Sequence, residues 1–274
     1  MTRPHIGGMD DDFEMPDDDF FEDDGPNYRP HTEINMWELP ESLGKLPLFG
    51  DLYMRMQANN IGLIDRWLMD VERDVLQRLI KEDRTPIDDA VFLNAQSQMW
   101  LFATYELLRT WRQRVQDVKK LVENGGLALK IESLEADKGY INFGKQMRAA
   151  QLRELQDNPQ IVDDITAALK RLHIPYTQLE VVRVSLAKHE VRKKPKMPVS
   201  APGYARIDRW TGSLSYEMGG GRVILGYITR RDISDSLRDL DHTAPPPTDD
   251  EIAAFDEHIS QLGDETELDL PDLL

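Results

Sequence analysis

Residues 88–123 read DDAVFLNAQSQMWLFATYELLRTWRQRVQDVKKLVE, and this stretch decides the fold. Its apolar residues recur at three- and four-residue steps, the period of one buried helical face. Asp88 and Asp89 suit a helix start, and Asn124-Gly125-Gly126 suits its end. Residues 100–108 are apolar nearly all round. The sequence therefore predicts a long helix whose middle turns lie at the centre of a bundle.

A second long amphipathic helix is predicted just before it, over residues 51–81. Its apolar residues again fall at three- and four-residue steps: Ile64, Trp67, Leu68, Val71, Val75 and Leu79. Thr85-Pro86 separates the two helices by a short turn. Short connections place neighbouring helices antiparallel, so we expect a helical hairpin.

The rest of the chain predicts shorter elements. Residues 127–134 fit either a strand or a helix start, and helices are expected over about 145–155, 161–172 and 177–190. Three short runs between residues 204 and 229 are separated by turn residues and predict an antiparallel β-meander. A closing helix follows over Arg230–Leu240. The expected fold class is mainly α: an antiparallel helical bundle with two long helices and a small β-meander.

Charge divides the chain into three parts. The net charge is −17; residues 1–24 hold ten acids against one arginine, and residues 239–274 hold twelve acids without lysine or arginine. The intervening residues carry +4, and the stretch Arg183–Arg209 alone carries eight bases against two acids. An anionic partner is one interpretation of that basic stretch. A solvated face or a guarded strand edge is the other.

The acidic ends predict arms rather than core. Residues 1–47 combine acid runs with prolines, a composition that buries too little apolar surface to offset its ordering entropy. We expect a disordered arm over 1–47, a domain over 48–242, and an acidic linker with a short amphipathic helix over 243–274. The arms could dock a protein partner or lie on the protein's own basic stretch.

Composition also excludes several classes of protein. The chain has no cysteine, which rules out disulfides, thiolate metal sites and a cysteine nucleophile. No signal-peptide core or membrane-spanning stretch is seen, so we expect a cytoplasmic protein with no membrane partner. The six histidines form no His-Glu-x-x-His pattern, so neither metal nor cofactor is expected.

A glycine-rich stretch, Gly139-Tyr-Ile-Asn-Phe-Gly144-Lys145-Gln146, has the spacing of a phosphate-binding loop through its lysine. That motif requires serine or threonine next, to hold magnesium, and Gln146 replaces it. The loop residues are also bulky. We interpret the stretch as a helix-capping turn.

One constellation carries chemistry: Arg183-Val-Ser-Leu-Ala-Lys-His189, on a late helix that opens the basic stretch. With the preceding helices it resembles the HEPN superfamily of helical-bundle ribonucleases, whose signature is an arginine and a histidine separated by four to six residues. Active members usually carry a polar residue after the arginine, where this chain has Val184. Six helical positions also turn about 600°, so the two side chains converge only if the helix bends or ends near Lys188.

The resemblance implies a metal-independent domain that binds or cleaves RNA, active or inactive, and a homodimer that brings two such motifs together. His189 would act as general acid or base and Arg183 would bind phosphate oxygens. The expected RNA-backbone contacts are Lys188, Arg192, Lys193, Lys194 and Lys196. The alternative is a non-enzymatic module that docks proteins through its acidic arms and its C-terminal amphipathic helix. A polar helix end, with Arg183 in an ion pair, is the purely structural interpretation of the motif.

Overall fold

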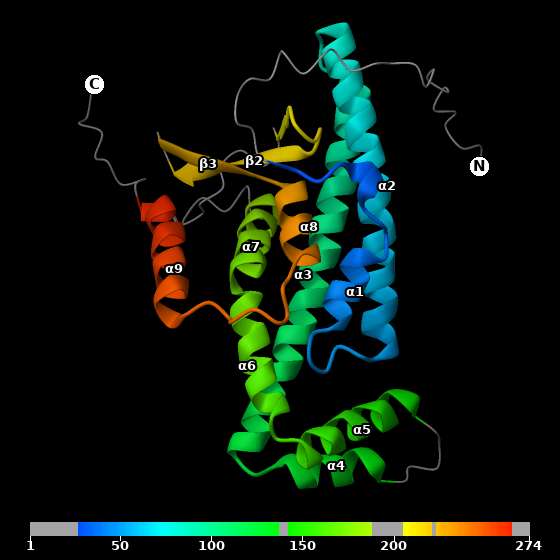
Figure 1. Ribbon diagram of the computed structural model, residues 1–274, viewed down its shortest axis with the longest axis vertical. Coiled ribbons are helices and arrows are strands. Elements are labelled where there is room, and N and C mark those ends of the chain that lie inside the picture. The colour runs from blue at the N-terminus through cyan, green and yellow to red at the C-terminus, as the bar shows by residue number, and fades with distance from the viewer. Residues whose placement is uncertain (1–26, 137–141, 188–204, 221–222, 265–274) are drawn as a thin grey trace.

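The computed structural model describes residues 27–136, 142–187, 205–220 and 223–264 (Figure 1). Helices dominate this part of the chain, and a three-stranded antiparallel sheet lies near its C-terminal end. The expected fold class is confirmed. None of the described helices is long and apolar enough to cross a membrane.

The two predicted long helices are present as α2 (Leu52–Glu82) and α3 (Ile87–Glu123), and they pack as a hairpin along the long axis of the molecule (Figure 1). The apolar middle of α3 lies in the core, where Trp100, Leu101 and Leu108 are buried. Asp51 caps α2 by accepting a hydrogen bond from the backbone N–H of Met54.

The buried face of α2 differs from the predicted one. Ile64 is exposed, whereas Asp65 and Glu72 are buried in line with Leu68 and Val75. A prediction from hydropathy places carboxylates on the solvent side of a helix. The buried face predicted from the apolar residues is therefore rotated about the helix axis relative to the observed face. The helix buries two acids because cations from a distant segment meet them.

Residues 27–47 correct the expected disordered arm. This segment contains the short 3-10 helix η2 (His31–Glu33) and α1 (Glu38–Gly44), and it buries Ile34, Leu39 and Leu43 in the core. Gly62 permits the contact with α2, since a Cβ there would meet the carbonyl oxygen of Met36 at 2.5 Å. The prolines and acids of the segment therefore did not prevent burial. Residues 1–26 lie outside the described part.

Four shorter helices complete the bundle: α4 (Leu127–Glu135), α5 (Phe143–Asp157), α6 (Ile161–Arg171) and α7 (His173–Ala187). The ambiguous stretch after the double glycine is thus helical. Helices α4 and α5 pair at the lower end of the molecule, and α6 and α7 follow α3 back toward the sheet (Figure 1). Helix α7 begins at His173, before the expected start at residue 177. Pro175 therefore lies in its first turn, where a backbone N–H has no partner within the helix and its absence costs no hydrogen bond.

The predicted meander is formed by β1 (Arg206–Ile207), β2 (Leu214–Gly220) and β3 (Val223–Thr229), in that order. Ser215 pairs with Thr229, and the register shifts between Met218 and Gly219. Thr229 then caps α8 (Arg230–Arg238) in a capping box with Asp232. Helix α8 lies between α7 and α1, so the C-terminal part of the fold closes over the N-terminal part.

A buried cluster of charged side chains joins α8 to α2, and we call Asp65, Glu72, Arg230 and Arg238 the α2–α8 ion cluster. The Arg230 guanidinium is fully buried and donates to both oxygens of Glu72, at 2.6 and 2.7 Å. It also donates to Asp65, which accepts a further bond from Arg238. Two cations therefore balance two carboxylates. Such a cluster stabilises a fold only while every partner is present.

The C-terminal helix α9 (Asp249–Asp264) lies beside α7 and the sheet (Figure 1). Polar contacts attach it: His173 to Asp256 at 2.7 Å and Lys170 to Asp249 at 2.8 Å. The ring of Phe255 meets the edge of His173. Between residues 249 and 259 no side chain of the helix is fully buried. The apolar packing of α9 against the rest of the protein is therefore limited.

Candidate functional site

Arg183 is the one predicted site residue that the structure describes. It lies on α7, one turn before that helix ends, and faces α3. Its guanidinium lies 4.8 Å from the ring centre of Tyr105 and 3.6 Å from a carboxylate oxygen of Glu106. The side chain keeps 29% of its surface exposed. The ion pair with Glu106 agrees with the purely structural interpretation of the motif, but the cation still reaches solvent.

Hydrogen bonds with the described residues contribute little to the placement of Arg183. The Glu106 contact is longer than a hydrogen bond, and no hydrogen bond joins the buried Nε to any residue in the described part of the chain. Glu106 is instead bonded to Arg109, at 2.9 and 2.7 Å. Arg183 is thus held by ring stacking and electrostatic attraction rather than by acceptors.

A line of arginines and tyrosines continues along the same two helices. We call it the α3–α7 seam: Phe102, Tyr105, Glu106, Arg109 and Arg112 of α3, with Tyr176, Glu180 and Arg183 of α7. The Tyr105 and Tyr176 rings stack at 5.5 Å, and the Arg112 guanidinium lies 3.9 Å above the latter. Antiparallel packing of α3 on α7 produces this spacing. Sequence reasoning missed the seam because its members lie about 70 residues apart.

Tyr105 anchors the seam as a hydrogen-bond donor. Its hydroxyl donates to Glu180 at 2.9 Å. Burial, reinforced by hydrogen bonds with Tyr176 and Glu180, raises the pKa of Tyr105 above its ordinary value. The phenol therefore stays protonated at neutral pH. Both tyrosine rings are buried, so neither can stack on a nucleotide base.

The remaining predicted residues lie outside the described part of the chain: Lys188, His189, Arg192, Lys193, Lys194 and Lys196. Helix α7 is described as far as Ala187. Convergence of His189 with Arg183 therefore stays a prediction. The other bases of the basic stretch follow Ala187 in the sequence.

The glycine-rich stretch supports the capping interpretation where it is described. Asn142 is the N-cap of α5, and its side chain accepts a hydrogen bond from the backbone N–H of Lys145. Gly144 and Lys145 lie in the first turn of that helix. Gly139 to Ile141 fall outside the described residues.

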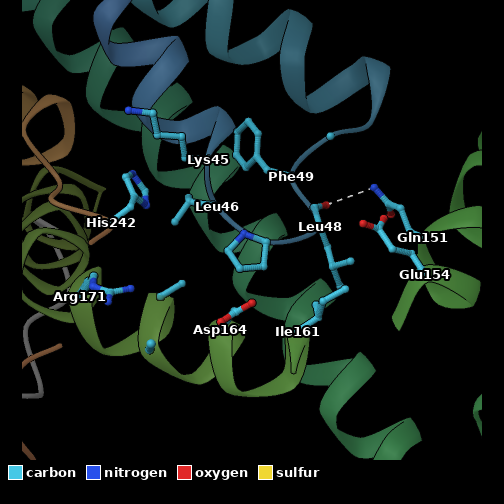
Figure 2. Close-up of a pocket in the computed structure, with 14 residues that line it drawn as sticks. Lys45, Leu46, Leu48, Phe49, Gln151, Glu154, Ile161, Asp164, Arg171 and His242 are labelled. Atoms are coloured by element: carbon cyan, nitrogen blue, oxygen red, sulfur yellow. Dashed lines mark hydrogen bonds between the residues drawn. The ribbon is translucent and has the colours of Figure 1, made fainter. Parts of the chain in front are cut away.

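The molecule has a separate polar pocket of about 540 Å³, shown in Figure 2. The connection from α1 to α2 forms one wall and α6 forms another, with Arg171 and His242 on the same side as Lys45. Asp164 and Glu154 supply negative charge. Leu48 lines the pocket with a left-handed backbone, φ 60°, and its carbonyl accepts from Gln151 at 3.4 Å.

The groups in this pocket do not form a catalytic pair. Burial lowers the pKa of His242, as does the charge of Lys45, so its imidazole is neutral at pH 7. Its Nε2 is buried without a hydrogen-bond partner among the described residues. Arg171 is engaged by the carbonyl oxygen of Ala244, at 2.6 and 3.0 Å. General acid-base work needs a positioned base and acceptor, which these contacts do not supply.

No family model matches this sequence, and no curated protein or solved structure matches it significantly. The resemblance to the HEPN superfamily therefore rests on the arginine-histidine motif and the bundle. Among the described residues, no three histidine or acidic side chains are grouped so as to hold a metal ion.

Proposed function

We propose that this protein binds RNA through Arg183 and the basic stretch that follows α7. One observation carries the proposal: a partly exposed guanidinium is oriented by the Tyr105 ring and by the Glu106 carboxylate, which at 3.6 Å lies beyond hydrogen-bond length. An arginine fork matches the oxygens of a phosphate group. Pre-orientation reduces the entropy lost when the phosphate binds.

Charge supports the same location. The seam contributes three arginines against two glutamates, and the stretch from Arg183 to Arg209 has an excess of six bases. Backbone phosphates bind such surfaces by displacing counterions, largely independently of sequence. The buried seam tyrosines favour backbone contacts over base stacking. Sequence-independent binding of single-stranded RNA is thus the expected form.

Binding is tested by titrating a fluorescent single-stranded RNA with the full-length protein. Arg183→Gln should weaken binding roughly tenfold, because a charge-assisted contact is lost. Arg153→Gln is the matched control, since that arginine is exposed on α5 and already engaged by Glu135. Equal affinities for the wild type and both variants would remove Arg183 from the proposal.

Cleavage is the stricter form of the proposal. It requires His189 to reach the 2′-hydroxyl or the leaving oxygen while Arg183 binds the phosphate. RNA cleavage should then persist in EDTA, and His189→Ala should slow it about 10²- to 10⁴-fold with binding retained. Binding without cleavage by the wild type would mark an inactive relative of the ribonucleases.

A protein-docking function is the second candidate, and the attachment of α9 favours it. Asp256 pairs with His173 of α7 and Asp249 pairs with Lys170 of α6, while Ile252 and Phe255 remain half-exposed. A partner helix could compete for the same face. Asp256→Asn should then increase capture of that partner, whereas RNA affinity should stay unchanged.

A further inference from the structure

A second pocket, of about 530 Å³, lies where the first turns of α2 and α5 approach each other, near the lower end of the molecule in Figure 1. Its walls are largely apolar: Leu52, Tyr53, Leu134, Phe143 and Met147. Tyr53 and Phe143 are exposed over 74% and 73% of their surfaces. Two such aromatic side chains beside one pocket are unusual, because large apolar groups normally avoid water.

Cations form the polar part of this pocket. Arg114, Lys145 and Arg148 line it against a single carboxylate, that of Asp51. Arg114 is already paired with Asp51. That pairing leaves the charges of Lys145 and Arg148 without a carboxylate partner in the described residues.

Arg148 is the group that most needs an anion. Among the described residues, its guanidinium donates only to neutral acceptors: the side-chain oxygen of Gln151 at 3.2 Å and the backbone oxygen of Arg114 at 3.5 Å. Burial, together with the neighbouring charge of Arg114, lowers the pKa of Arg148 to about 10, although the charges of Asp51 and Asp117 act in the opposite direction. Burial and the Arg114 charge both act against the cation, although it remains charged at neutral pH. A bound negative charge would relieve them.

We propose that this pocket binds a small organic carboxylate with an apolar body, such as an acyl chain. The carboxylate would lie against Arg148, and the chain would cover Leu52, Tyr53 and Phe143. The volume falls within the range of small-molecule sites, and apolar walls with a few convergent polar groups are typical of them. Charge complementarity selects a carboxylate over a neutral lipid, because a neutral group leaves Arg148 uncompensated.

The probe for this proposal is decanoate, with decan-1-ol and acetate as comparisons. Binding to the full-length protein is measured by calorimetry below the critical micelle concentration. Decanoate should bind at least roughly tenfold more tightly than either comparison compound, since decan-1-ol lacks the carboxylate and acetate lacks the long alkyl chain. Equal binding of decanoate and decan-1-ol would overturn the proposal, because the cations would then play no part.

Two variant pairs locate the site. Arg148→Gln should weaken decanoate binding roughly tenfold, whereas Arg153→Gln, on the same helix but outside the pocket, should not change it. Phe143→Ser tests the apolar wall without disturbing the core. Its control is Leu129→Ser on α4, which is similarly exposed and does not line the pocket. An affinity for decanoate that is unchanged in both Arg148→Gln and Phe143→Ser would refute the assignment.

The acidic, phenylalanine-containing N-terminal stretch is a competing occupant. It is tested in the full-length chain by replacing Phe13, Phe20 and Phe21 with serine. Unchanged decanoate affinity supports a small-molecule site. An increase of more than tenfold would show that the chain itself fills the pocket, and it would overturn the proposal.

Discussion

Glu72→Gln tests the α2–α8 ion cluster most sharply, because it removes one charge while keeping the side chain's shape. In the wild type, the two oxygens of Glu72 accept bonds from Arg230, which is fully buried beside Trp100. The neighbouring carboxylates raise the pKa of Arg230 although its burial alone would lower it. The guanidinium therefore stays charged in the variant, with Asp65 shared between it and Arg238.

Breaking a buried pair on one side costs about 3–5 kcal/mol, because an uncompensated charge remains. For a chain of this size that corresponds to a fall in Tm of about 5–9 °C. The assay is urea unfolding followed by circular dichroism, with Glu135→Gln as the control. Glu135 pairs with Arg153 on the surface, where such a pair contributes under about 1 kcal/mol. A loss below 1 kcal/mol for Glu72→Gln would show that the buried Arg230 does not depend on this carboxylate.

Two further predictions concern stability. Gly212 has φ 74°, and a Cβ there would lie 2.1 Å from the carbonyl oxygen of Glu72, so Gly212→Ala should cost about 2 kcal/mol or more in urea unfolding. Gly44→Ala, with nothing within 4 Å, should be near neutral, and equal effects would contradict the account. Burial alone would raise the pKa of Asp51, but its bonds with Arg114 and the backbone N–H of Met54 lower it overall. The stability that this depressed pKa confers is present above about pH 4 and lost as pH falls through the folded-state value. Asp51→Asn should flatten the loss between pH 5 and 3, and an unchanged pH profile would argue against the pairing.

The sequence predicted the elements that periodicity specifies. The α2–α3 hairpin, the meander and α8 all follow from local patterns, because strong alternation and turn residues fix them without tertiary context. It failed where distant groups compensate each other. Asp65 and Glu72 are seven residues apart on one helix face, in line with Leu68, and that spacing was the available signal. The corresponding signal on the partner helix α8 was the pair Arg230 and Arg238, which are eight residues apart.

The candidate site was predictable only in part. Arg183 could be singled out because of its spacing to His189. Its contact with Tyr105 could not be predicted, because the two residues are 78 positions apart and only the antiparallel packing of α3 on α7 brings them together. Residues 27–47 were assigned to a disordered arm from composition. Several of their apolar residues, such as Leu39 and Leu43, are nevertheless buried in the core, whereas Trp37 is exposed. Composition averages over a segment, whereas burial depends on the positions of individual side chains.

The most direct test of the proposed function is the salt dependence of single-stranded RNA binding by the full-length protein. The logarithm of affinity should fall linearly with the logarithm of potassium chloride concentration. Each lost phosphate contact reduces that slope by about 0.7, so Arg183→Gln should be shallower by about that amount. Arg153→Gln should retain the wild-type slope. Absence of binding at 50 mM salt, or identical slopes for all three proteins, would contradict RNA binding through Arg183.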